Sequence, residues 1–143
     1  MTFSTNSAKR LSLAAACLLT ATLGYAVRFH APAPEWLRDA SGGAAYVVFW
    51  ILAAAIVFTE AAPFRLALFA LMATCAVEFL QLWRPPWLEA LRATLPGRLV
   101  LGTTFAWQDF PPYIAGAWIG WRILRAAARP TPPSAGLANL DKY

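Results

Sequence analysis

Four long apolar stretches, separated by short polar segments, dominate the pattern of the chain. Charged residues or proline bound each stretch, as Lys9-Arg10 and Arg28 bound the first. A helix needs about 20 apolar residues to cross a bilayer, so the stretches are of the right order for one crossing each. We therefore predict an all-α membrane protein, a bundle of four transmembrane helices at residues 11–27, 44–59, 64–83 and 109–124.

The segments between the predicted spans differ in kind. Residues 29–43 hold prolines, paired glycines and mixed charges, which are typical of a surface loop. Glu60 and Pro63 separate the second and third spans by a very short turn, so these two helices should be antiparallel neighbours.

A short amphipathic helix is predicted between the third and fourth spans. Its charged residues, Glu89 and Arg92, fall away from its apolar face, which favours a helix lying in the membrane interface. Pro96-Gly97 should end this helix. Residues 98–108 then favour a re-entrant or interfacial turn over a strand, because unpaired backbone is costly in lipid. The apolar face consists of Trp87, Leu88, Leu91 and Leu95.

The predicted membrane domain covers residues 11–127, between an N-terminal cytoplasmic tail at 1–10 and a disordered Pro-rich tail at 128–143. A cleaved signal peptide is the alternative for the first span, since Ala31-Pro32-Ala33 resembles a cleavage region. We favour a span, because the apolar run is long for a signal core and Arg28 separates it from that region.

Composition agrees with the membrane class. Apolar residues make up 59% of the chain and charged residues 13%, against about half and a quarter in soluble domains. The net charge of +5 points to membrane lipids and not to nucleic acid, because the basic residues stand singly at the ends of apolar runs.

Seven Lys and Arg fall on the side of the N-terminus and five on the other. This favours an orientation with both termini in the cytoplasm.

Glu78 is the first candidate for a functional residue, because it lies inside the third predicted span. An acidic residue within a span costs up to about 3 kcal/mol, so such residues usually have a function or a partner. Gln81 at i+3 and Thr74 at i−4 extend a polar stripe on the same helical face. The alternative is a hydrogen-bond cluster that only holds helices together.

Asp109 is the second candidate, directly before the fourth span, where it could also serve simply as a helix cap. Tyr113, Gly116 and Gly120 continue its helical face as a small-residue seam. If this seam packs on the third span, Glu78 and Asp109 form the candidate catalytic pair. The candidate substrate-binding residues are Gln81, Arg92, Tyr113 and Arg28, with Arg92 expected to neutralise one carboxylate.

No cofactor or metal motif is found in the sequence. The single histidine, His30, lies in a predicted loop without Asp or Cys neighbours, and Cys17 and Cys75 lack the spacing of a metal site or disulfide framework.

The segment from Val77 to Gly116 closely resembles the domain-of-unknown-function family 2809 (DUF2809) of small bacterial membrane proteins, and more remotely the VanZ-like proteins of the cell envelope. The resemblance implies a four-span inner-membrane protein with a polar site and no established reaction. Where the family usually has Gly-Asp, this chain has Gly42-Gly43, so one carboxylate is missing. The residues that carry the resemblance are Glu78-Phe79-Leu80-Gln81-Leu82, Pro86-Trp87-Leu88, Arg92-Ala93-Thr94, Gly97, Leu99-Val100-Leu101-Gly102, Phe105, Trp107, Asp109, Tyr113 and Gly116.

Three functions are consistent with these observations. The first is a site at the outer interface that binds or acts on an envelope lipid or amphiphile, since paired carboxylates can hold a cation or perform acid–base chemistry. The second is an accessory subunit without chemistry, whose Gly116–Gly120 seam and Trp-rich outer surface dock a larger membrane complex. A homo-oligomer is a further possible assembly. The third is a cation-coupled carrier, which four spans would support only in a dimer.

Overall fold

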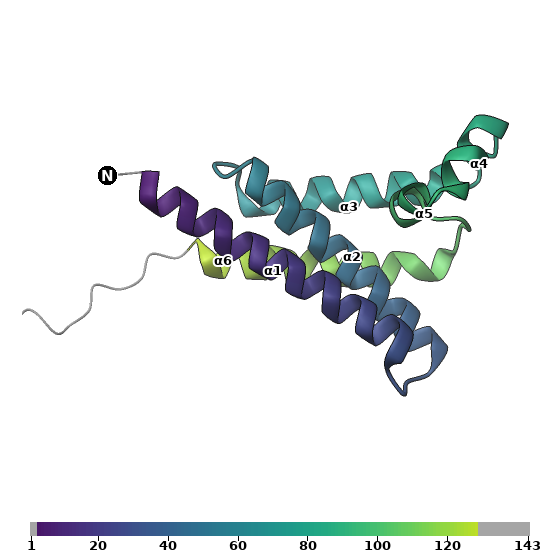
Figure 1. Ribbon diagram of the computed structural model, residues 1–143, viewed down its shortest axis with the longest axis horizontal. Helices are drawn as coiled ribbons and strands as arrows, with labels where there is room; N and C mark the ends of the chain where they lie inside the picture. The colour runs from purple at the N-terminus through teal and green to yellow at the C-terminus, as the bar shows by residue number, and fades with distance from the viewer. Residues whose placement is uncertain (1–2, 129–143) are drawn as a thin grey trace, which may run out of the picture.

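The structure, a computed structural model, describes residues 3–128 and the side chains from residue 7 onward. Within that range the chain is all helical and contains no strand. Four of its six α-helices carry proline in the first turn, where the missing N–H costs nothing. The elements are α1 Phe3–His30, α2 Glu35–Val57, α3 Pro63–Leu80, α4 Pro86–Ala93, α5 Leu95–Leu101, the 3-10 turn η1 Trp107–Asp109, and α6 Phe110–Ala127 (Figure 1).

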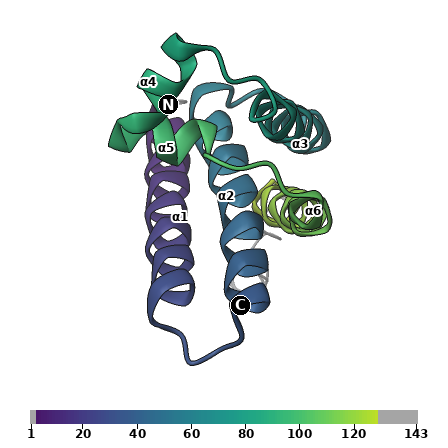
Figure 2. The ribbon, with the colours of Figure 1, turned by 90° about the vertical axis from the view of Figure 1, so that its right-hand side faces the viewer.

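The helix α2 lies at the centre of the bundle and packs against α1, α3 and α6, while α3 also packs against α6. The pair α1 and α2 crosses the pair α3 and α6 obliquely (Figures 1 and 2). The start of α1, the α2–α3 connection and the end of α6 form one end of the bundle, and α4 and α5 lie at the other (Figure 1). We refer to this second end as the α4–α5 end.

Glycines allow the central helices to approach closely. A Cβ on Gly24 of α1 would lie 2.8 Å from the Cβ of Ala45 of α2. A Cβ on Gly116 of α6 would collide with the backbone of Ala44, and one on Gly120 would lie 2.6 Å from the side chain of Ile51. The seam on α6 therefore packs on α2, not on α3 as expected, because α2 occupies the centre of the bundle.

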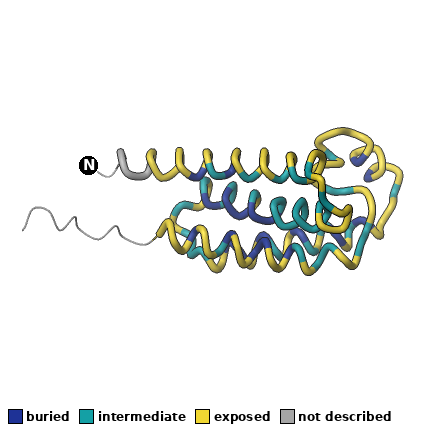
Figure 3. The backbone as a smooth tube through the Cα atoms, turned by 90° about the horizontal axis from the view of Figure 1, so that it is seen from below, coloured by how far each residue is buried: buried dark blue, intermediate teal, exposed yellow. Residues whose placement is uncertain are grey.

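The surface of the bundle is apolar, and its interior holds mostly small and aliphatic side chains. Figure 3 shows the buried residues gathered on the inner helices. Large apolar side chains are exposed on every long helix, including Leu18 and Leu19 of α1, Phe69 of α3 and Ile114 of α6. Such a surface suits a lipid environment. The core consists of Leu13, Cys17, Val47, Val48, Ile51, Leu52, Ala55, Leu66, Ala67, Ala70, Tyr113, Ala117 and Leu124.

Three helices are long and apolar enough to cross a membrane: the Ser7–His30 part of α1, α2 and α3. The residues of the predicted fourth span form the helix α6, which has 18 residues like α3, or about 27 Å at 1.5 Å per residue. Two prolines, Arg122 and Arg125 lower its apolar content, and α6 is not among the three.

The prediction of a surface loop over residues 29–43 is wrong. Helix α1 continues to His30 and α2 begins at Glu35, so only residues 31–34 connect them. Gly42 and Gly43 sit inside α2, where tertiary packing overrides their low helix propensity. A Cβ on Gly42 would lie 3.4 Å from Cδ of Arg28, and one on Gly43 would lie 3.2 Å from Cε1 of Tyr113.

The short helix predicted after the third span is present as α4, but Pro96-Gly97 does not end it. Helix α4 ends at Ala93, and Thr94 becomes the N-cap of α5, its hydroxyl accepting a hydrogen bond from the Gly97 N–H at 3.1 Å. Proline and glycine in the first turn therefore begin a second short helix. Of the predicted apolar face of α4, Leu88 is buried while Trp87 and Leu91 are exposed.

Candidate functional site

Glu78 is the centre of the candidate site. It lies in the last turn of α3, and its side chain is 2% exposed. Its Oε1 accepts a hydrogen bond from the backbone N–H of Ala106 at 2.7 Å. Its Oε2 accepts one from the hydroxyl of Tyr113 at 2.9 Å and one from Nε2 of Gln81 at 3.4 Å. Three elements thus meet at one carboxylate, and none of the three donors is positively charged.

Gln81 follows α3 as its C-cap and is 5% exposed. Its amide packs over Gly102, where a Cβ would collide with Nε2 and where φ is +63°, a conformation that favours glycine. The Oε1 atom of Gln81 is buried and accepts no hydrogen bond from any described residue. A buried polar atom without a partner is costly, so this oxygen is an unsatisfied acceptor within the site.

Asp109 occupies the N-cap position of α6, but its side chain makes no capping hydrogen bond. The helix-cap explanation for this residue is therefore not realised. The carboxylate is half-buried and, within residues 3–128, forms no hydrogen bond or ion pair. Burial raises the pKa of the Asp109 carboxyl above its usual 3.8, the charge of Glu78 raises it further, and the charge of Arg28 partly opposes both.

Arg28, near the end of α1, forms an ion pair with Asp39 of α2. Its side chain packs against Gly42, the neighbour in the chain of Gly43, which faces Tyr113. Arg28 therefore lies beside the site and is already paired with an acidic residue, Asp39.

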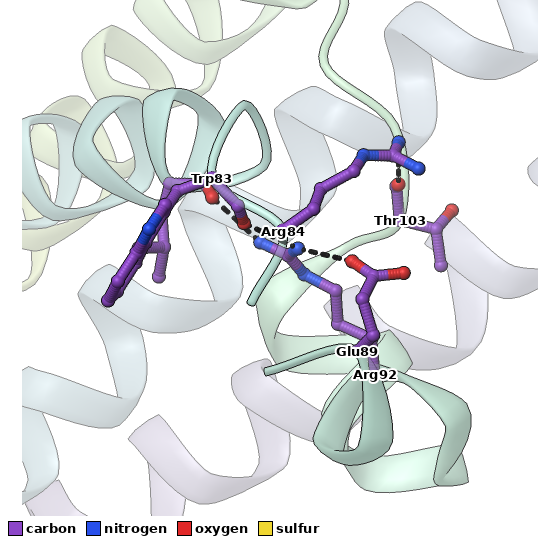
Figure 4. A network of polar contacts seen from close by, with 6 residues as sticks. Trp83, Arg84, Glu89, Arg92 and Thr103 are labelled. Atoms are coloured by element: carbon purple, nitrogen blue, oxygen red, sulfur yellow. Dashed lines mark hydrogen bonds and ion pairs between the residues drawn. The ribbon is translucent and has the colours of Figure 1, made fainter. Parts of the chain in front are cut away.

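Arg92 of α4 lies at the α4–α5 end but does not contact either site carboxylate. Its side chain is 3% exposed and donates to the backbone carbonyls of Leu80 at 2.8 Å and Trp83 at 3.1 Å, and to Oε1 of Glu89 at 2.8 Å (Figure 4). The guanidinium thus satisfies the carbonyls left free at the end of α3, which is a favourable place for a cation. Arg92 was expected to neutralise Glu78 or Asp109. It pairs instead with Glu89, one helical turn away, and with carbonyls at the end of α3.

A second contact holds the same region together. Arg84, in the turn after α3, donates to the backbone carbonyl of Thr103 at 3.3 Å (Figure 4). The hydroxyl of Tyr46 on α2 donates to the carbonyl of Val100 on α5 at 2.8 Å. Segments after α3 and after α4 are thereby fixed over the end of the bundle, where they cover Glu78.

Four aromatic rings form a cluster beside Glu78. Trp107 and Phe110 stack with ring centroids 5.6 Å apart, and Trp107 lies 4.9 Å from Phe105. Phe79 contacts all three other rings. Trp107 is 71% exposed and Phe79 48% exposed, so the cluster presents an aromatic surface next to the polar site. We call Phe79, Phe105, Trp107 and Phe110 the aromatic cluster.

The structure brings together Glu78, Gln81 and Tyr113 through hydrogen bonds and places Asp109 and Arg28 beside them. It places Arg92 elsewhere. Thr74, expected on the same polar stripe, donates to the carbonyl of Ala70 in its own helix.

Sequence reasoning missed the backbone N–H of Ala106, the close approach of Gly43 to Tyr113, and the aromatic cluster. The type of a residue does not indicate whether its backbone N–H will donate a hydrogen bond to a site. The spacing of Phe105, Trp107 and Phe110 is visible in the sequence, but on its own it does not indicate that Phe79 joins them.

These observations define the class of protein: a small protein, all helical over residues 3–128, with three helices long and apolar enough to cross a membrane and a buried polar site at one end. A family model described as "Protein of unknown function (DUF2809)" matches residues 32–117, which is more than half of the chain, so the protein belongs to this family. The match includes Glu78, Gln81, Arg92, Asp109 and Tyr113, and Arg28 lies outside it. Comparisons with curated proteins and with solved structures give no match.

Proposed function

We propose that the protein is a four-span inner-membrane protein that binds a membrane amphiphile, with an amine headgroup received by Asp109, Gln81 and Glu78. The observation that carries this proposal is the unpaired, half-buried carboxylate of Asp109, which lies in the chain between Ala106 and Tyr113, two residues that both donate hydrogen bonds to the buried carboxylate of Glu78. The proposal is for binding and includes no chemical step.

The available groups at the site are acceptors. Asp109 and the Oε1 of Gln81 have no donor among the described residues, and the donors near Glu78 are already engaged with it. A primary ammonium offers three donors, no acceptor and one positive charge, and so complements such a site. A phosphate is a poor match, because Arg92 is committed to Glu89 and to the end of α3.

The position of the site supports a lipid headgroup as ligand. Glu78 is two residues from the end of α3 and Asp109 directly precedes α6, so both lie near the level at which the bundle would leave the hydrocarbon. Exposed aromatic rings are typical of that level, and Trp107 is the most exposed member of the aromatic cluster. An aromatic face can also hold a cation.

The four-span arrangement and the topology are part of the proposal. Helix α6 is buried between α2 and α3 along Tyr113, Ala117 and Leu124, and Arg122 and Arg125 lie near its end, where long side chains can reach the interface. The excess of Lys and Arg on the side of the N-terminus favours both termini in the cytoplasm, with the site at the outer face.

Native mass spectrometry of the detergent-purified protein, titrated with phosphatidylethanolamine or phosphatidylcholine, tests the proposal. The first lipid has a primary ammonium and the second has no headgroup donor. We expect the wild type to retain phosphatidylethanolamine more strongly. We expect Asp109→Asn to weaken that retention about tenfold, the loss of one hydrogen bond to a charged group.

Glu60→Gln is the matched control, because Glu60 is an exposed acid in the α2–α3 connection, at the opposite end. It should leave retention unchanged. Equal retention of both lipids by the wild type, or unchanged retention of phosphatidylethanolamine by a folded Asp109→Asn variant, would overturn the proposal.

A further inference from the structure

A groove lies between α2 and α3 at the end of the bundle opposite to the candidate site. Its volume is about 470 Å³, and it is open on one side. Five of the six residues that line it are apolar, and the sixth is arginine. The lining consists of Ala54, Phe58, Ala61, Arg65, Leu66 and Phe69.

Arg65 stands at this groove without a partner. It is exposed, and no described residue forms an ion pair or hydrogen bond with its side chain. Phe58 and Phe69 are 59% and 70% exposed, so two aromatic rings border the groove near the cation. An apolar groove with one free guanidinium matches a molecule that has an apolar chain and an anionic head.

Charge at this end of the bundle favours an anion. Among the described residues, five cations lie at the start of α1, at the start of α3 and near the end of α6, and Glu60 is the one acid. Lys9 also donates to the carbonyl of Thr59 at 3.2 Å, which holds the start of α1 against the α2–α3 connection. We call this the basic end, defined by Lys9, Arg10, Arg65, Arg122 and Arg125.

The α4–α5 end differs in its balance of charge. Its arginines are offset by acids, as in the pairs Arg28–Asp39 and Arg92–Glu89. A net positive field is therefore confined to the basic end, where each Lys or Arg near a membrane surface contributes attraction to anionic lipid.

We propose that the groove at the basic end binds an anionic phospholipid, with an acyl chain along Phe58, Leu66 and Phe69 and the phosphate at Arg65. This site is separate from the site of Glu78 and Asp109 and does not depend on its function.

Native mass spectrometry with phosphatidylglycerol, and with phosphatidylethanolamine in parallel, tests this inference. We expect Arg65→Gln to weaken retention of phosphatidylglycerol about fivefold and to leave phosphatidylethanolamine unaffected. Ala54→Leu, which fills the groove and keeps the charge, should also weaken retention of phosphatidylglycerol.

Arg98→Gln is the matched control, because Arg98 is an exposed arginine on α5 at the opposite end, with no side-chain partner among the described residues. It should behave as wild type. Retention of phosphatidylglycerol that is unchanged in Arg65→Gln, or reduced equally in Arg65→Gln and Arg98→Gln, would refute the groove as a site. Asp109→Asn should leave phosphatidylglycerol retention intact, so the two proposals can fail separately.

Discussion

The hydrogen bond between Tyr113 and Glu78 should contribute measurably to the stability of the bundle, and a double-mutant cycle can isolate it. The O–O distance is 2.9 Å, and the two side chains are 9% and 2% exposed. Tyr113→Phe removes only the hydroxyl. Glu78→Met removes the acceptor while keeping a similar unbranched length.

The size of the expected coupling follows from the setting of the bond. Hydrogen bonds to charged groups contribute about 1.5–3 kcal/mol in soluble proteins, whereas couplings between membrane helices average about 0.6 and reach about 1.7 kcal/mol. In the Tyr113→Phe variant, Oε2 of Glu78 would keep only the donor Gln81 at 3.4 Å, which is a long contact. We therefore expect a coupling of about 1.5 kcal/mol, near the top of the range for membrane helices.

The free energy of unfolding, measured by tryptophan fluorescence during denaturation in mixed micelles, gives the four corners of the cycle. The N–H of Ala106 loses its acceptor in both Glu78→Met variants, so that loss cancels. Tyr113→Phe and Glu78→Met should each destabilise, and their sum should exceed the effect of the double variant. Additivity within about 0.3 kcal/mol would show that the two side chains do not interact and would refute this description of the site.

Three further predictions concern other residues. Arg92→Met leaves the carbonyls at the end of α3 and Glu89 without their donor, and should lower the free energy of unfolding in micelles by about 3 kcal/mol; a loss no larger than that of Arg98→Met would contradict the buried contact. Gly116→Leu would collide with the backbone of α2 and should abolish cooperative unfolding, whereas Ile114→Leu on the exposed face of α6 should change stability by less than about 0.5 kcal/mol. The folded-state pKa of Asp109 is raised, so stability falls as pH rises from 3.8 through the folded-state pKa. In thermal unfolding, Asp109→Asn should then be more stable than wild type at pH 7 and equally stable at low pH. A stability that varies more with pH in the variant than in wild type would contradict the raised pKa of Asp109.

The helices that sequence reasoning located well are those whose boundaries are made by local chemistry. Pro63 begins α3 and Arg84-Pro85-Pro86 follows its end, and both signals are independent of the rest of the fold. The start of α2 could not be located in this way. Gly42-Gly43 is a loop signal by propensity, but both glycines lie inside α2, and Gly43 packs against Tyr113, a residue 70 positions away.

In the candidate site, too, some residues could be predicted from the sequence and some contacts could not. Glu78 and Gln81 could be predicted because an ionisable residue in an apolar run is costly and its neighbours on the same helix are known from spacing. Tyr113 was indicated by its place on the helical face of Asp109, but its contact with Glu78 depends on how α6 packs against α3. The partners of Arg92 could not, because two of them are backbone carbonyls at the end of α3. Any residue type there would provide the same acceptors, so this contact cannot be predicted from the sequence.

The central position of α2 has a consequence for how the protein is made. Its closest neighbour on one face is α6, whose Gly116 contacts Ala44 from about 70 residues further along the chain. At a synthesis rate of 5–20 residues per second, that face waits roughly 4–14 s for its partner to leave the ribosome. Until then the nascent chain displays in the bilayer an uncovered helix face that includes Val47 and Ile51, and the membrane-insertion machinery or lipid must shield it.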